Sequence, residues 1–292
     1  MKNKLAFCIL SVLIISTLDL IRQMNDFKMP DKWFVKTLVV VDETLKNKTE
    51  NTSKQFVMNA IGKVNDIFFP VGIHLIIGDI LVENEDEVGP LRFVHPLEQH
   101  ISLIEMAKWN MKNDQYDIVV TLTGIDKIFI DMGRELAGQA LFGRVCHKNE
   151  NVAFVRIKDV ADNLSITTLA HEIAHLLGVV HDGEARGDGD IDAPGAKSCN
   201  SEEGFIMESG SKMEQITKWM SDDSWSKCSK DQLSYFSATE LWDCLDRKSP
   251  LTVKYPTKDI SKYLLWSGYH RGKHLYGDTW WSVKLLLSIF YN

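Results

Sequence analysis

The chain has 292 residues, of which 45% are hydrophobic and 25% are charged. This length accommodates one domain of good size with additional segments, and the apolar share is ordinary for a globular protein with a substantial core. The formal net charge of −7 argues against nucleic acid as a partner, because the phosphate backbone binds positively charged surfaces.

Residues 1–24 are typical of a secretory signal peptide. Lys2 and Lys4 precede an apolar run from Leu5 to Leu18, which is broken at Asp19. The run is short for a membrane span. We therefore expect a secreted, extracellular protein without a stable membrane anchor; a signal anchor is the alternative.

Strands and helices alternate in the following part of the chain. Residues 34–41 are β-branched and apolar, which predicts a buried central strand. Amphipathic or proline-initiated helices are predicted over 52–69, closed by Pro70, and over 96–112. Further strands are predicted over 71–82, 116–122 and 151–157. The alternation predicts an α/β fold, with an open, twisted, mostly parallel sheet and flanking helices.

A histidine motif at 171–182 reads H-E-x-x-H-x-x-G-x-x-H-D. On a helix, His171 and His175 share one face and can bind one zinc ion from the same side. Gly178 is a natural helix end, because glycine reaches the left-handed conformation at no steric cost. The chain can then turn back and deliver His181 as a third ligand. Three protein ligands leave a fourth position for water, as in catalytic zinc sites.

Glu172 lies next to the first of these histidines. Its carboxylate can accept a proton from a zinc-bound water without being a ligand, which predicts a general base. Ser165 or Thr167 is predicted to cap the N-terminus of the helix.

The motif is the metzincin signature, and the Asp182 that follows it resembles the adamalysin or reprolysin branch, which includes snake-venom, tick-salivary and ADAM-type metalloproteases. The resemblance implies a metzincin catalytic domain over 33–248, with a smaller irregular subdomain after the zinc helix. It also implies that Met207, within the segment 204–209, forms the methionine turn beneath the zinc and that Asp182 is structural. Residues 249–292 form a basic, aromatic tail to which this resemblance does not extend; disorder, a packed extension and an aberrant C-terminus are the alternatives for it.

The segment from Gly138 to Cys146 resembles the G-x-A-x-x-G-x-x-C edge strand of the same family. Gly138, Ala140 and Gly143 occupy the matching positions. An edge strand beside a cleft has free backbone N–H and C=O groups, so an extended peptide substrate can pair with it as an added strand. A glycine-rich loop anchored by a disulfide is the alternative.

Five cysteines are present, and Cys8 would leave with the signal peptide. An even number of remaining cysteines in a secreted chain favours two disulfides, with three possible pairings. The resemblance implies the pairs Cys146–Cys244 and Cys199–Cys228. A zinc–cysteine site is the weaker alternative, because the chain has no C-x-x-C spacing. N-glycosylation sequons begin at Asn47, Asn51 and Asn163.

The last predicted element is a helix. Its sequence runs from Ser229 to Leu245, with Ser229 and Gln232 as a capping box at its N-terminus.

Two places in the chain bear on calcium binding. Alternating aspartates at 188–192 suggest calcium but lack the glycine and glutamate that an EF-hand needs, so a solvated loop is favoured. At the calcium position of the family Asp117 is retained, but the acidic residue expected in the first strand is replaced by Lys36 or Thr37 and Arg247 stands where an Asn is usual. A basic group repels the ion, and calcium is not assigned.

Together these residues predict a secreted zinc-dependent endopeptidase with one catalytic Zn²⁺. The resemblance alone implies extracellular-matrix or plasma proteins as substrates. The alternative from another class is a catalytically weak secreted binding or toxin protein on the same fold, recruited through the basic tail. The intact zinc motif and Glu172 favour the enzyme.

Overall fold

The computed structural model describes nine stretches of the chain. These are residues 33–49, 53–82, 116–125, 129–130, 134–147, 150–158, 163–185, 193–208 and 223–245. The predicted signal peptide, the helix predicted over 96–112, the aspartates at 188–192 and the tail over 249–292 lie outside the described residues, as do Asn51 and the side chain of Asn47.

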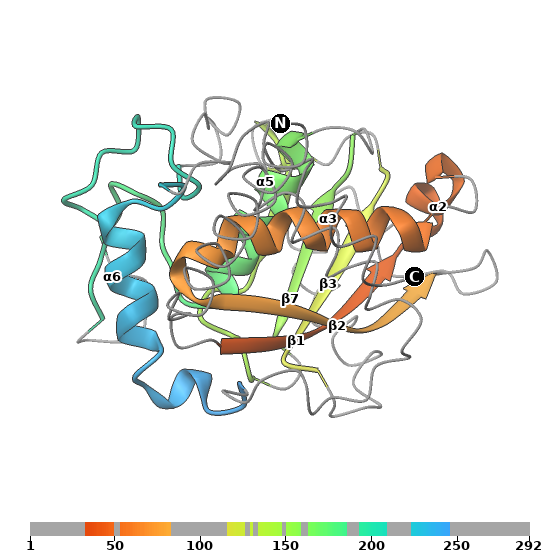
Figure 1. Ribbon diagram of the computed structural model, residues 1–292. Coiled ribbons are helices and arrows are strands. Elements are labelled where there is room, and N and C mark those ends of the chain that lie inside the picture. The colour runs from red at the N-terminus through yellow and green to blue at the C-terminus, as the bar shows by residue number, and fades with distance from the viewer. Residues whose placement is uncertain are drawn as a thin grey trace, which may run out of the picture.

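A five-stranded sheet forms the centre of the described part, in the order β2-β1-β3-β7-β6 (Figure 1). Its strands are β1 (Trp33–Val41), β2 (Ile73–Val82), β3 (Ile118–Thr123), β6 (Gly138–Ala140) and β7 (Val152–Arg156). The pairs β1–β2, β1–β3 and β3–β7 are parallel, whereas β6 runs antiparallel to β7. A separate ribbon pairs β4 (Phe129–Ile130) with β5 (Arg134–Glu135). The prediction of a mostly parallel α/β sheet is confirmed.

The first strand is an interior strand, as its apolar sequence predicts. Val35, Val39 and Val41 pack into the main core, whereas Leu38 and Val40 join a smaller cluster with Phe154 on the other face of the sheet. Successive side chains of a strand point to opposite faces, so a strand covered on both sides must be apolar throughout.

Helices α3 (Ser53–Phe68) and α5 (Asn163–Leu176) flank the sheet on the same side (Figure 1). The 3-10 turn η1 (Phe69–Val71), which contains Pro70, ends α3. The short helix α2 (Glu43–Thr49) follows β1. Apolar residues of both long helices, among them Ile61 and Ile173, are fully buried in the main core. None of the helices in the described stretches is long and apolar enough to cross a membrane.

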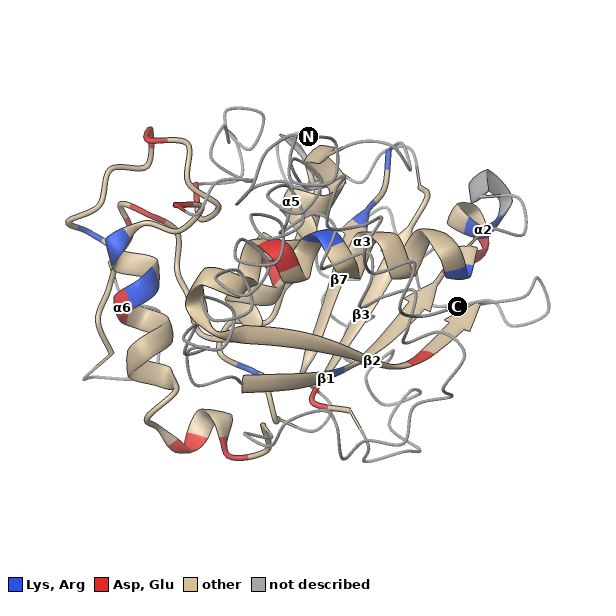
Figure 2. Ribbon diagram, in the orientation of Figure 1, with Lys and Arg blue, Asp and Glu red and all other residues tan. Residues whose placement is uncertain are grey.

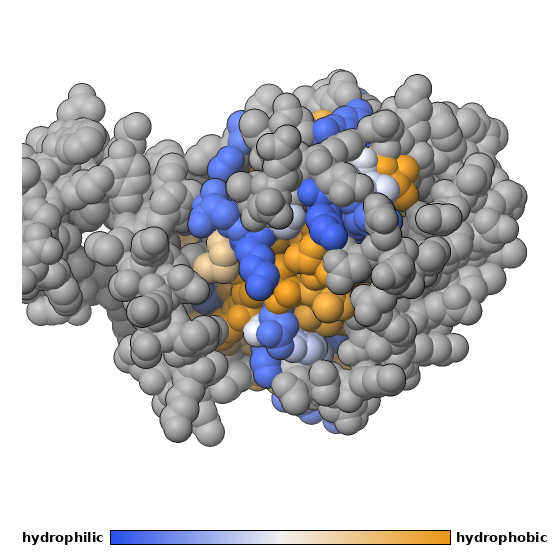
Figure 3. Space-filling view, turned by 90° about the vertical axis from the view of Figure 1, so that its right-hand side faces the viewer, coloured by the Kyte–Doolittle hydropathy of each residue, from blue (hydrophilic) through white to orange (hydrophobic). Residues whose placement is uncertain are grey.

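The described surface carries ion pairs at α6 (Lys227–Phe236) and an apolar area elsewhere (Figures 2 and 3). Figure 2 shows charged residues on α6. Lys227 pairs with Asp231 within this helix, Lys230 pairs with Asp223 before it at 3.0 Å, and all four side chains are exposed. In the view from the side that carries α2 in Figure 1, the visible apolar residues of the described part gather mainly in one central area, next to hydrophilic ones (Figure 3).

The final helix differs from its prediction over 229–245. α6 starts at Lys227, because the Ser226 hydroxyl accepts a hydrogen bond from the Ser229 N–H at 3.1 Å and is therefore the N-cap. The predicted capping box of Ser229 and Gln232 is wrong. α6 ends at Phe236, and a separate 3-10 turn, η4 (Glu240–Trp242), follows it. The Thr239 hydroxyl donates to the Phe236 carbonyl at 2.8 Å and so competes with continuation of the helix.

Two further sequence-based expectations are corrected. α5 begins at Asn163, so Ser165 and Thr167 lie inside the helix and neither caps it. The Thr167 hydroxyl instead donates to the Asn163 carbonyl at 3.0 Å, the bond that threonine makes within a helix. The edge strand β6 ends at Ala140, and Gly143 lies in the following turn with a φ of +62°.

Candidate metal centre

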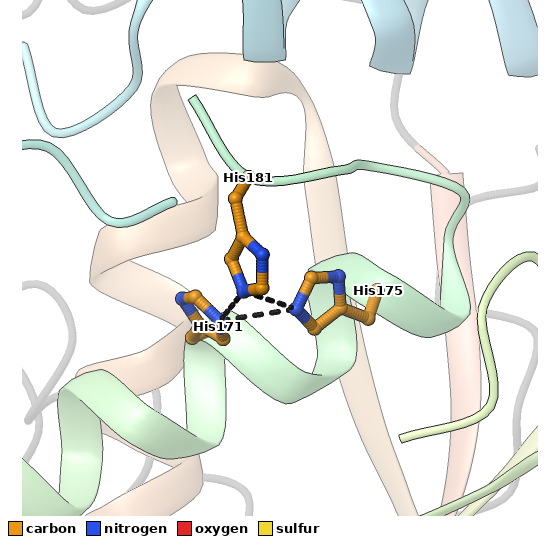
Figure 4. A group of neighbouring side chains, drawn as sticks. All are labelled: His171, His175 and His181. Atoms are coloured by element: carbon orange, nitrogen blue, oxygen red, sulfur yellow. Dashed lines mark hydrogen bonds between the residues drawn. The ribbon is translucent and has the colours of Figure 1, made fainter. Parts of the chain in front are cut away.

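Three histidine side chains converge on one point (Figure 4). His171 and His175 project from adjacent turns of α5, and His181 comes from the segment that follows the helix. Their Nε2 atoms are separated by 3.0 Å between His171 and His175 and by 3.1 Å for each of the other two pairs. A tetrahedral zinc ion with Zn–N bonds of about 2.05 Å holds its nitrogens roughly 3.3 Å apart. The cluster therefore fits a single metal ion.

The outward-facing nitrogens determine which tautomer each imidazole adopts. His171 Nδ1 donates to the Ile206 carbonyl at 2.7 Å, and His175 Nδ1 donates to the Val179 carbonyl at 2.7 Å. His181 Nδ1 donates to Glu184 Oε1 at 2.9 Å. These oxygens only accept, so each Nδ1 carries the hydrogen and each Nε2 presents a lone pair to the centre.

The surroundings also keep the His171 and His175 imidazoles neutral. Burial, assisted by the neighbouring His181, lowers the pKa of His171 to about 3. Burial and the two other imidazoles lower the pKa of His175 well below its usual value. Neutral imidazole is the form that binds a metal, so the site is prepared for one at physiological pH.

The turn between the second and third histidines depends on a glycine. α5 ends at Leu176, and Gly178 has a φ of +99°, which a residue with a side chain adopts only at a cost. The Gly178 N–H donates to the His175 carbonyl at 3.0 Å, which closes the end of the helix. The chain reverses there and leads to His181.

Side chains of α6 and η4 form hydrogen bonds with the backbone of this turn. Gln232 Oε1 accepts from the Val180 N–H at 3.0 Å, and the Trp242 indole donates to the Leu177 carbonyl at 3.2 Å. Asp182 is 2% exposed, and its Oδ1 accepts from the Ser226 hydroxyl at 2.6 Å. Burial raises the pKa of the Asp182 carboxyl to about 6.

Met207 lies in the turn that the sequence predicts and is fully buried. Its carbonyl accepts from the Asp182 N–H at 2.8 Å, and the preceding carbonyl, that of Ile206, accepts from His171. The backbone of this turn therefore contacts both the first histidine and the residue after the third.

Glu172 is 4% exposed and lies against β6. A Cβ atom on Gly138 would lie 2.8 Å from Glu172 Cγ and 2.9 Å from its Oε1, so the carboxylate packs on bare backbone. Within the described residues, Glu172 Oε2 makes no hydrogen bond. Burial raises the pKa of the Glu172 carboxyl to about 8. This carboxyl is therefore able to hold and release a proton near neutral pH.

The short strand β6 presents one free edge within the described sheet. Arg156 N–H donates to the Ala137 carbonyl at 2.8 Å, and Leu141 N–H donates to the Val152 carbonyl at 3.4 Å. Backbone groups alternate in direction along a strand, so those of Gly138 and Ala140 point away from β7. Gly143 is not part of this edge; its N–H donates to the His175 carbonyl at 2.8 Å.

Two disulfides secure the segments around the cluster. Cys146 is bonded to Cys244, and Cys199 is bonded to Cys228, with Cα–Cα distances of 5.5 Å and 6.1 Å. These are the pairs that the family resemblance implies. The second joins the loop after the histidine motif to the first turn of α6.

Sequence reasoning did not identify three residues that support the centre, namely Glu184, Ser226 and Gln232. Ser226 carried a detectable signal, because serine is a preferred N-cap residue and stands three positions before Ser229. Glu184 and Gln232 carried none, because an exposed glutamate and a helical glutamine are ordinary residues whose partners only the folded chain shows.

Comparison with known proteins places this arrangement in a family. The model of the Reprolysin (M12B) family zinc metalloproteases matches residues 33–249. A Naja atra protein, zinc metalloproteinase-disintegrin-like atrase-B, is 30% identical over 54% of this chain and 26% of its own length. A Bombyx mori protein, "A disintegrin and metalloproteinase with thrombospondin motifs like", is 30% identical over 51% of this chain and 22% of its own length.

A mouse protein, "A disintegrin and metalloproteinase with thrombospondin motifs 12", is 25% identical over 85% of this chain and 15% of its own length. The chain thus spans about a quarter or less of these curated relatives. The family match covers both the sheet and the histidine cluster. The chain belongs to the Reprolysin (M12B) family of zinc metalloproteases, and its three clustered histidines are suited to hold the zinc ion.

Proposed function

We propose that this protein is a zinc-dependent endopeptidase in which His171, His175 and His181 hold the ion and Glu172 is the general base. The observation that carries the proposal is the combination in one place of three converging Nε2 lone pairs and a buried carboxylate with an unpartnered oxygen. Three protein ligands, rather than four, are characteristic of a catalytic zinc.

Zinc bound by the three histidines would lower the pKa of a bound water to about 7 and polarise the carbonyl of the scissile peptide bond. Glu172 takes the proton of the attacking water at a carboxylate oxygen, and we assign this proton to Oε2, which has no other partner in the described residues. The buried carboxyl then passes the proton to the leaving amine. Met207 and Asp182 hold the histidines in place and do not take part in the chemistry.

The substrate chain would bind as an added strand at β6. The outward-facing backbone groups of Gly138 and Ala140 supply donors and acceptors for an extended peptide. Gly138 also lies against Glu172, so a peptide at this edge would pass beside the base. Gly143 does not contribute to the edge and instead supports the end of α5.

We further infer that the protein is secreted and acts on extracellular proteins, with matrix or plasma proteins as the substrate class. Two disulfides support an oxidising compartment. The Asn163 side chain of the third sequon is exposed, which is consistent with a glycan at that position. A venom or salivary origin is part of the same proposal.

The test measures zinc content and casein cleavage by the secreted chain, with and without a chelator. Glu172→Ala is expected to retain zinc, because it leaves all three histidines, and to lose at least about 100-fold in rate, because a positioned base contributes that much or more. Glu240→Ala, which removes an exposed carboxylate in η4, is the matched control and should cleave like the wild type.

Two results would contradict the proposal. Wild-type turnover by Glu172→Ala would remove the general base from the mechanism. Bound zinc without any cleavage by the wild-type protein would favour the alternative of a binding protein on the same fold.

A further inference from the structure

The outward nitrogens of the three histidines have unequal partners. His171 and His175 donate to backbone carbonyls, at 2.7 Å each, inside the protein. His181 donates to a side chain, Glu184 Oε1, at 2.9 Å, and this contact lies at the surface, with the two side chains 24% and 53% exposed. The third histidine is therefore oriented by a negatively charged group that a single substitution can remove.

The backbone around Glu184 is well held, although its side chain is half exposed. The Glu184 N–H donates to the His181 carbonyl at 3.1 Å, which closes a tight turn over these four residues. The Glu184 carbonyl accepts from the Ala196 N–H at 2.9 Å, and the Gly183 N–H donates to the Ala196 carbonyl at 2.9 Å. Gly183, with a φ of +87°, permits the turn. The fold thus places the carboxylate opposite the imidazole.

We infer that Glu184 is a positioning residue for the metal: its carboxylate keeps the hydrogen on His181 Nδ1, orients Nε2 toward the centre and strengthens His181 as a ligand. A carboxylate behind a ligating histidine raises the basicity of the ring and fixes its orientation, and loss of such a partner costs 10- to 100-fold in metal affinity. His181 needs this support most, because it comes from a loop, whereas the other two histidines are held by α5. The inference rests on the proposed zinc ligands.

The test compares Glu184→Ala, which removes the acceptor, with Glu184→Gln, which keeps an acceptor oxygen but loses the charge. His181→Ala is the reference for loss of a ligand, and Glu240→Ala is the control for loss of an exposed carboxylate elsewhere. Zinc affinity is measured for the full chain by competition with a coloured chelator. The visible absorption of the Co²⁺-loaded protein reports the geometry of the ligands, and the melting temperature of the zinc-free protein reports folding.

For Glu184→Ala we expect a 10- to 100-fold weaker zinc affinity, a changed Co²⁺ spectrum and an unchanged zinc-free melting temperature. Glu184→Gln should fall between this variant and the wild type. Wild-type affinity in Glu184→Ala, equal losses in the two variants, or a lowered zinc-free melting temperature would overturn the positioning role. Unchanged affinity in His181→Ala would instead refute the proposed ligand set, so the two failures are distinguishable.

Discussion

At the scale of single residues, the candidate base and the candidate substrate strand share one contact. Glu172 packs on Gly138 so closely that a Cβ atom there would lie 2.8 Å from Glu172 Cγ and 3.0 Å from the Phe154 carbonyl oxygen. Neither neighbour can yield easily, because Glu172 is buried and the carbonyl belongs to β7. The absence of a side chain at residue 138 therefore determines where the carboxylate lies.

Gly138→Ala is predicted to displace Glu172 and to lower kcat by about 100-fold, since a shift of about 1 Å in a catalytic group has effects of that size. Zinc content should be unchanged, because the three atoms nearest to the added Cβ belong to Glu172 and Phe154 and not to a histidine. Steady-state cleavage of a fluorogenic peptide, with zinc determined on the same samples, checks both. Gln139→Ala on the same strand is the control, and wild-type kcat in Gly138→Ala would show that the contact is unimportant.

At the scale of elements, α5 supplies two of the histidines and α6 supports the turn that brings in the third. Gln232 of α6 accepts from Val180, and the Phe236 ring lies where a Cβ on Gly178 would come within 2.6 Å of it. Gly178 therefore meets two demands: a left-handed backbone and close approach of a helix.

Gly178→Ala is predicted to lower the free energy of unfolding by about 3 kcal/mol, since backbone strain and overpacking each cost about 1–3 kcal/mol. Gly143→Ala separates the two causes. Gly143 also has a positive φ, +62°, but a Cβ there meets nothing closer than 4.0 Å, so only the strain applies and about 1 kcal/mol is expected. Urea denaturation of the metal-free proteins gives both values, and equal losses would refute a contribution from Phe236.

At the scale of the whole molecule, the centre joins segments that are distant in the sequence. α5, which packs on the sheet, carries two of the clustered histidines, and the loop after α5 carries the third. The Cys199–Cys228 bond and the Ser226–Asp182 hydrogen bond attach this loop to α6. A metal ion that bridges α5 and the loop would therefore stabilise the native state as a unit.

Removal of zinc is predicted to lower the melting temperature by roughly 10 °C. Free ligand at 1,000 times its Kd stabilises by about 4 kcal/mol, and a domain of this size shifts by about 2–4 °C per kcal/mol. Calorimetry with and without a chelator measures the effect. His175→Ala should melt at the same temperature in both conditions, and an equal chelator effect in that variant would place the stabilising metal elsewhere.

The sequence by itself determined the parts of this protein that depend on local patterns. The apolar runs specified β1, β3 and β7, the helical periodicity specified α3, and the spacing of His171, His175 and Gly178 predicted a helix followed by a turn. The family resemblance added the disulfide pairs. These features succeed because periodicity and glycine conformation act within a few residues of one another.

Only the tertiary structure determined which hydrogen-bond partner each polar side chain has. Thr167 bonds within its helix and does not cap it, Ser226 caps α6 in place of Ser229, and Gln232 bonds both within its own helix and to the histidine turn. Glu184 likewise bonds to His181 within a turn that Gly183 permits. A hydroxyl, amide or carboxylate forms hydrogen bonds with whichever group the folded chain brings within about 3 Å. The separation of two residues in the sequence does not predict this distance.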